Sequence, residues 1–145
     1  MNELNVKVAK ALGYRIKPTG VVKIATMLGF DEQLMQTIDP NGYIIHEAWY
    51  DPSHEDLFAY VIDHLQEIRK LPNWQGNAGD AIALMENWMG KKGFLVRIEY
   101  ARSNHYVATL DFWGVLGVSR GDTLPEVICN LFVEWHEAIE RDKAE

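Results

Sequence analysis

The sequence predicts an α+β fold: an α-β-α sandwich in which helices cover both faces of an antiparallel sheet of three to four strands. Two observations carry this prediction. Side chains alternate with period 2 over residues 94–101, as in a half-buried strand, and apolar residues recur at helical spacing before and after the region of expected strands. A chain of 145 residues suits one hydrophobic core, so we expect a single domain over residues 1–145.

The chain is expected to begin with a helix over residues 5–12, which Gly13 ends. Pro18-Thr19-Gly20 is typical of a turn, and residues 21–28 are then predicted as a short helix.

A hairpin is predicted next. Residues 39–42 read Asp-Pro-Asn-Gly, which is a strong turn sequence with Gly suited to a positive φ. A strand is expected at residues 43–49, and residues 35–38 are its expected partner.

Two helices are predicted in the middle of the chain. The first covers residues 53–70, with Ser53 as its N-cap and one apolar stripe along its length. The second covers residues 80–89 and ends at Gly90. Between them, residues 71–79 (LPNWQGNAG) are expected to form an internal linker or mobile loop.

Three strands are expected after the second helix, because side-chain character alternates with period 2. They cover residues 94–101, 106–113 and 115–119, with a hairpin turn at Arg102-Ser103-Asn104 and a break at Gly114.

The last helix has the clearest signals. Thr123 precedes Glu126 by three residues, which is the spacing of a capping box, and a broad apolar face follows. That face consists of Leu124, Val127, Ile128, Leu131, Phe132, Trp135 and Ile139. The charged tail, residues 137–145, is expected to fray into solvent.

Charge argues against one class of partner. The chain has 14 Lys and Arg against 21 Asp and Glu, a net charge of −7, so general nucleic-acid binding is disfavoured. No apolar run is long enough to span a membrane, and the N-terminus lacks the pattern of a secretory signal. With a single cysteine, we expect a cytoplasmic protein.

Four short motifs are similar to those of one known family. They are LNVKVAKALGY (4–14), WYDPS (49–53), Gly93-Phe94 at the start of a strand, and GDTLPEVIC (121–129). Together they resemble the phage α-β-α sandwich domain family, small proteins of bacteriophages and prophages. The resemblance implies that fold, and it supplies no catalytic residues. Residues 71–79 look like an insertion relative to the family.

Two other resemblances were weighed. Residues 106–138 are similar to antitoxins of the HicB type, in which a strand hairpin leads into Gly-Asp-Thr-Leu-x-Glu and a helix. The order of elements also resembles double-stranded RNA-binding domains, which place lysines at the start of the last helix. That position is acidic here, so we reject RNA binding.

No catalytic or metal-binding set emerges from the sequence. None of the His-Glu pairs is followed by the second His of His-Glu-x-x-His, and Cys129 has no companion cysteine. Cys129 is interpreted as a buried, inert thiol rather than a nucleophile. A hydrolytic group of Ser119, Asp122 and His105 lacks a nucleophile elbow. We therefore expect no metal, no cofactor and no enzymatic activity.

Contact residues are predicted among aromatics outside the helix stripes and the arginines near them, which would anchor a protein or stack on a nucleotide. They are Trp49, Tyr50, Trp74, Arg97, Arg102, Trp113 and Arg120. The competing interpretation is that the aromatics fill gaps between helices and sheet.

The leading hypothesis is a non-enzymatic phage or prophage accessory protein that binds a host or defence protein. A nucleotide-binding protein is the alternative, and a HicB-like antitoxin is the third. A homo-oligomer is left open.

Overall fold

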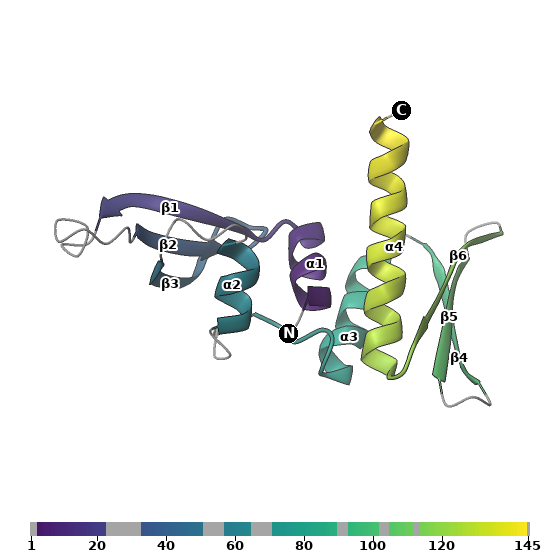
Figure 1. Cartoon of the computed structure of the whole chain (residues 1–145). Coiled ribbons are helices and arrows are strands. Elements are labelled where there is room, and N and C mark those ends of the chain that lie inside the picture. Colours follow the sequence, from purple (N-terminus) through teal and green to yellow (C-terminus); the bar gives the residue numbers. More distant parts are fainter. Residues whose placement is uncertain are drawn as a thin grey trace. The chain divides into compact units, whose positions relative to one another are not determined.

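A computed structural model of the chain describes residues 3–22, 33–50, 57–64, 71–89, 93–101, 105–111 and 114–144. The fold is α+β, with helices and two antiparallel three-stranded sheets, as the sequence predicts in its class (Figure 1). The chain divides into two compact units, Met1–Leu71 and Pro72–Glu145, each with one of the sheets. The prediction of one domain over residues 1–145 stays a prediction.

The N-terminal unit begins with helix α1 (Glu3–Leu12), which ends at Gly13 as expected. Gly13 has a φ of 99°, and the Tyr14 N–H donates to the carbonyl of Ala9, which is the hydrogen bond of a Schellman C-cap. Asn5, Val6, Val8 and Ala9 are the buried residues of α1.

Strand β1 (Arg15–Val22) corrects the prediction of a turn at Pro18-Thr19-Gly20. It pairs antiparallel with β2 (Gln33–Ile38), and the register shifts between Pro18 and Val22. Proline has no N–H for a ladder hydrogen bond, but β1 is an edge strand and tolerates it there. The proline and glycine signals were therefore misread as a turn.

The predicted hairpin is confirmed. Strand β2 pairs antiparallel with β3 (Ile44–Tyr50). The Asp39 carboxylate accepts hydrogen bonds from the backbone N–H groups of Asn41 and Tyr43 at 3.0 and 2.9 Å, and Gly42 has a φ of 91°. The turn sequence thus sets the hairpin through one side chain and one positive φ.

Helix α2 (Leu57–His64) lies within the predicted helix over residues 53–70, and it contacts both α1 and β1. Phe58, Val61 and Ile62 are buried in this unit. The predicted N-cap Ser53 and the expected C-terminal turn of the helix lie outside the described residues.

In the C-terminal unit, the segment expected as a mobile loop forms a hydrogen-bonded turn that caps the next helix. Trp74 is 3% exposed, and the side chain of Asn77 accepts a hydrogen bond from the Asp80 N–H at 3.0 Å. The Asp80 carboxylate in turn accepts from the Asn73 N–H at 2.9 Å. Helix α3 (Ala78–Leu84) begins there and continues as a short π-helix, η2 (Met85–Met89).

The three strands predicted in this unit are confirmed as β4 (Leu95–Ala101), β5 (His105–Asp111) and β6 (Val115–Gly121). They form a sheet in the order β4-β5-β6, with antiparallel pairing throughout. The expected turn at residues 102–104 lies outside the described residues.

Helix α4 (Leu124–Ala144) packs on β5 and β6. The predicted apolar face forms the core, because Val127, Ile128, Leu131 and Phe132 are all almost completely buried. At its start, the Thr123 hydroxyl accepts a hydrogen bond from the Glu126 N–H at 3.3 Å, which is one half of the predicted capping box.

The expectation that residues 137–145 fray is wrong for most of that tail, because α4 continues to Ala144. Ala, Glu, Arg and Lys, the residues that predominate in this tail, favour helix intrinsically. His136 and Glu140, one turn apart, add a side-chain contact with Nε2 3.9 Å from Oε1.

Both α3 and α4 lie on the same side of the β4–β6 sheet (Figure 1). Helices on both faces of one sheet are not seen among the described residues of this unit, so that part of the sandwich stays a prediction.

The end of β6 and the first turn of α4 approach so closely that only glycine fits at Gly121. A Cβ built on Gly121 would lie 2.7 Å from the backbone nitrogen of Val127 and 2.9 Å from its Cα. This close contact lies where the chain passes from β6 into α4.

Replacing Gly121→Ala should lower the free energy of unfolding by about 1–3 kcal/mol, because the added methyl group forces β6 and α4 apart. Urea unfolding followed by circular dichroism measures this. Gly117→Ala is the matched control on the same strand, since its Cβ would lie 4.0 Å from Cδ1 of Leu131, an ordinary contact. Equal losses in the two variants would contradict the proposed clash.

Candidate functional surface

The β4–β6 sheet has one face packed under α4 and one face without a helix among the described residues. Side chains alternate between these faces along each strand, and cross-strand partners share a face. The pairs Ile98–Ala108 and Ala108–Ser119 therefore place these three residues on the inner face, beneath α4. The intervening residues form the other face, which we call the outer face.

Ten residues of the outer face have described side chains, and none of these is buried. They are Leu95, Arg97, Glu99 and Ala101 of β4, His105, Val107, Thr109 and Asp111 of β5, and Val118 and Arg120 of β6.

Large apolar side chains are exposed to solvent on this face. Leu95 is 57% exposed and Val118 is 52% exposed, and Val107, one row along the sheet from Val118, is half-buried. Exposed apolar groups in a flat sheet are typical of a surface that binds another protein. Two arginines, Arg97 and Arg120, flank them on β4 and β6.

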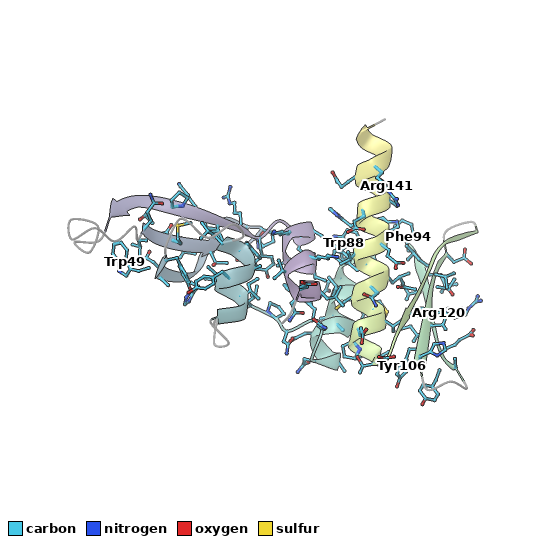
Figure 2. All side chains as sticks on the ribbon, viewed as in Figure 1. Trp49, Trp88, Phe94, Tyr106, Arg120 and Arg141 are labelled. Atoms are coloured by element: carbon cyan, nitrogen blue, oxygen red, sulfur yellow. The ribbon has the colours of Figure 1, made fainter. Side chains whose placement is uncertain are left out.

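Two of the seven predicted contact residues lie on this surface, on its two edge strands. Arg97 lies opposite Thr109, which lies opposite Val118, and Arg120 lies opposite Val107 on the neighbouring row. Both arginine side chains are exposed, and Arg120 is labelled on the sheet in Figure 2. The backbone carbonyl of Arg120 accepts a hydrogen bond from the Asn130 side chain at 2.8 Å.

The predicted aromatic contacts do not join them. Trp49 is half-buried and Tyr50 is buried, both on β3 of the N-terminal unit. Trp74 is buried in the C-terminal unit. Arg102 and Trp113 lie outside the described residues. Tyr50 and Trp74 thus fit the competing interpretation, in which aromatics fill gaps in a core.

Burial also explains the titration of Tyr50. Its ring lies edge-on to Tyr60 with centroids 5.5 Å apart, and burial, with a smaller contribution from Tyr60, raises the pKa of Tyr50 to about 12. Its phenol is therefore protonated at neutral pH, and it belongs to the packing of the N-terminal unit.

The groups weighed for catalysis are separated by the sheet. Ser119 is buried on the inner face, whereas His105 lies on the outer face opposite Ala101. Because a β-sheet separates the side chains of its two faces, these two cannot form a nucleophile–base pair.

Cys129 lies inside the core, as the sequence indicates. It is completely buried in α4, and burial, with a smaller contribution from Glu126, raises the pKa of its thiol to about 12. A thiol with so high a pKa is not a nucleophile at neutral pH.

Sequence reasoning missed Leu95, Glu99 and Val118 as surface residues of interest. Their signal was the period-2 alternation itself, which placed Leu95 and Glu99 on the side opposite Val96 and Ile98. Only the packing of α4 shows which of the two sides is covered.

The helix layer holds its own aromatic cluster. The Trp88 ring lies edge-on to Phe132 and to Trp135, with centroids 4.1 and 4.2 Å apart, and Phe94 lies 5.1 Å from Trp135 (Figure 2). These contacts join η2 and the start of β4 to α4, so the cluster is part of the packing.

No model of a known protein family, no curated protein and no solved structure matches this chain. Among the described residues, no group of three or more His, Cys, Asp or Glu is placed to hold a metal ion. Nor does any helix of the described part combine the length and apolar character needed to cross a membrane.

Cys129 should react with a thiol reagent such as dithionitrobenzoate at pH 8 only when α4 opens, because the folded thiol is both buried and protonated. The reaction rate in native buffer should be far below the rate in denaturant, measured by absorbance on the same sample. As the only cysteine, it gives an unambiguous signal. Immediate stoichiometric reaction of the native protein would contradict this assignment.

Proposed function

We propose that this chain is a non-enzymatic binding protein that holds a protein partner against the outer face of the β4–β6 sheet. One observation carries the proposal: exposed Leu95 and Val118 share a helix-free face with exposed Arg97 and Arg120. Apolar groups supply affinity when they are buried, and flanking charges supply orientation and specificity.

The chemistry of the face also describes the partner. Val107, Val118 and Arg120 form a patch on β5 and β6, with Arg120 directly beside Val107. This patch suits a partner surface with an apolar centre and a carboxylate positioned for Arg120, since Arg recognises carboxylates through two parallel hydrogen bonds. The motif resemblance to phage α-β-α sandwich domains supports a host or defence protein as that partner, and a phage or prophage as the source.

The nucleotide alternative has less support. It requires aromatic side chains to stack on a base beside an arginine, and Tyr50 and Trp74 are buried. A thermal-shift panel of nucleotides tests it, and reproducible stabilisation would favour it over the protein partner. The antitoxin alternative rests on the order β5, β6, α4, and it requires a toxin reading frame beside this one.

Replacing Val118→Asp together with Arg120→Glu should abolish capture of the partner from infected bacterial cells, because it removes the apolar centre and reverses the charge. With the captured protein purified, titration calorimetry should show affinity weaker by about tenfold or more. Arg141→Glu is the matched control, since it reverses an exposed charge on α4 of the same unit.

A partner that binds the double variant as tightly as the wild type would rule out this face. Turnover of a substrate by the purified chain in a broad hydrolase screen would rule out the non-enzymatic role.

A further inference from the structure

Strand β4 is an edge of its sheet that is regular enough to accept another strand. An edge strand exposes unpaired backbone N–H and C=O groups, and natural proteins usually block such edges with bulges, prolines or lysines. At the opposite edge, β6 has a register shift near Asp111 and contains Gly117 and Gly121. Strand β4 pairs with β5 over Leu95–Ala101 without any shift, and it contains neither glycine nor proline.

The sequence of β4, LVRIEYA, complements itself when it is read against a second copy running in the opposite direction. If Ile98 lies opposite Ile98 of the second copy, Arg97 lies opposite Glu99 and Glu99 lies opposite Arg97. Oppositely charged side chains placed directly across two strands stabilise the pairing.

We propose that two copies of this chain pair antiparallel through β4, with Ile98 at the twofold axis, to form a continuous six-stranded sheet. A twofold axis perpendicular to the sheet gives an isologous interface and keeps equivalent faces on the same side. Arg97 and Glu99 are exposed outer-face residues in each copy, so the two opposite-charge pairs form on one continuous outer face.

The inner face supports the same register. Tyr100 is 62% exposed, although it lies on the face that α4 covers elsewhere. The proposed pairing puts Tyr100 opposite Val96 of the second copy, and an aromatic residue across from a β-branched residue is a favourable cross-strand pair. The register thus adds an apolar neighbour to Tyr100, whose ring already lies edge-on to Tyr106 with centroids 5.0 Å apart.

Charge selects this register over its neighbours. Moving the twofold axis by one residue places Arg97 opposite Arg97 or Glu99 opposite Glu99, and like charges directly opposite each other are destabilising. The edge strand β3 of the other sheet lacks this property, because its pairing with β2 shifts register between Thr37 and Ile38 and its central residue Glu47 would face itself.

The dimer goes beyond the proposed function and shares with it only Arg97, which the pairing would engage. Val118 and Arg120 lie on β6, at the other edge of the sheet, and the pairing of β4 leaves them free to bind a partner. The dimer would present two such patches on one sheet, which raises avidity for a partner with two binding sites.

Sedimentation velocity on the purified full chain tests the proposal. The wild type should sediment as a dimer at high micromolar concentration and dissociate on dilution. Arg97→Glu alone and Glu99→Arg alone should each weaken the dimer about tenfold to a hundredfold, because both charge pairs become repulsive. The double variant Arg97→Glu/Glu99→Arg should restore it, since opposite charges again face each other.

Mixing the two single variants is the most specific test of the proposed pairing between residues 97 and 99. In the mixture, every position 97 faces an opposite charge at position 99 of the other chain, so a heterodimer should form from two monomeric samples. Arg97 and Glu99, the two residues that are changed, are both exposed in each copy, and circular dichroism checks that each variant is folded. Arg120→Glu, on the same face but on β6, should leave the dimer unchanged.

A wild-type chain that stays monomeric at high micromolar concentration would overturn the proposal. So would a dimer that survives both single variants, or a double variant and a mixture that remain dissociated. Because Val118 and Arg120 are tested separately in partner binding, failure of the dimer and failure of the proposed function are distinguishable.

Discussion

The packing of α4 on strands β5 and β6 is the contact on which the C-terminal unit depends. Its apolar face supplies Val127, Ile128, Leu131 and Phe132, which are almost completely buried, and burying each such side chain stabilises the fold by roughly 1.5–3 kcal/mol. Gly121 lets the strand reach the helix without a clash. This one contact decides which side of the sheet is core and which is surface.

Several features follow from that decision. Ser119 and Cys129 lie on the covered side and are removed from solvent, and the thiol is held in its protonated form. Residues that alternate with these along the strands are exposed on the outer face. They include Leu95 and Arg97 on β4 and Val118 and Arg120 on β6. Because the groups on the covered face are buried, they are not available to react with a substrate. The outer face offers exposed apolar and charged side chains, which suit the recognition of a partner surface, so binding is the function that the geometry supports best.

The three-stranded sheet also has two unlike edges. On β6, the register shift and glycines loosen the ladder, and the strand leads directly into α4. On β4, the ladder is regular and the charges alternate in a self-complementary order. In the N-terminal unit the pairing of both edge strands shifts register, between Pro18 and Val22 on β1 and between Thr37 and Ile38 where β2 meets β3. When one edge strand of a sheet is irregular and the other is regular, association with another strand is directed to the regular edge.

The sequence by itself determined the elements of the C-terminal unit. Period-2 alternation predicted β4, β5 and β6, helical periodicity predicted α4, and Thr123 predicted its start, because these signals depend on neighbours along the chain. It failed at Pro18, where an edge position overrides the usual preference of proline, and at the tail of α4. Of the predicted contacts, Arg97 and Arg120 are exposed, whereas Tyr50 and Trp74 are buried. Exposure depends on which element packs over which face, and only the tertiary structure decided that.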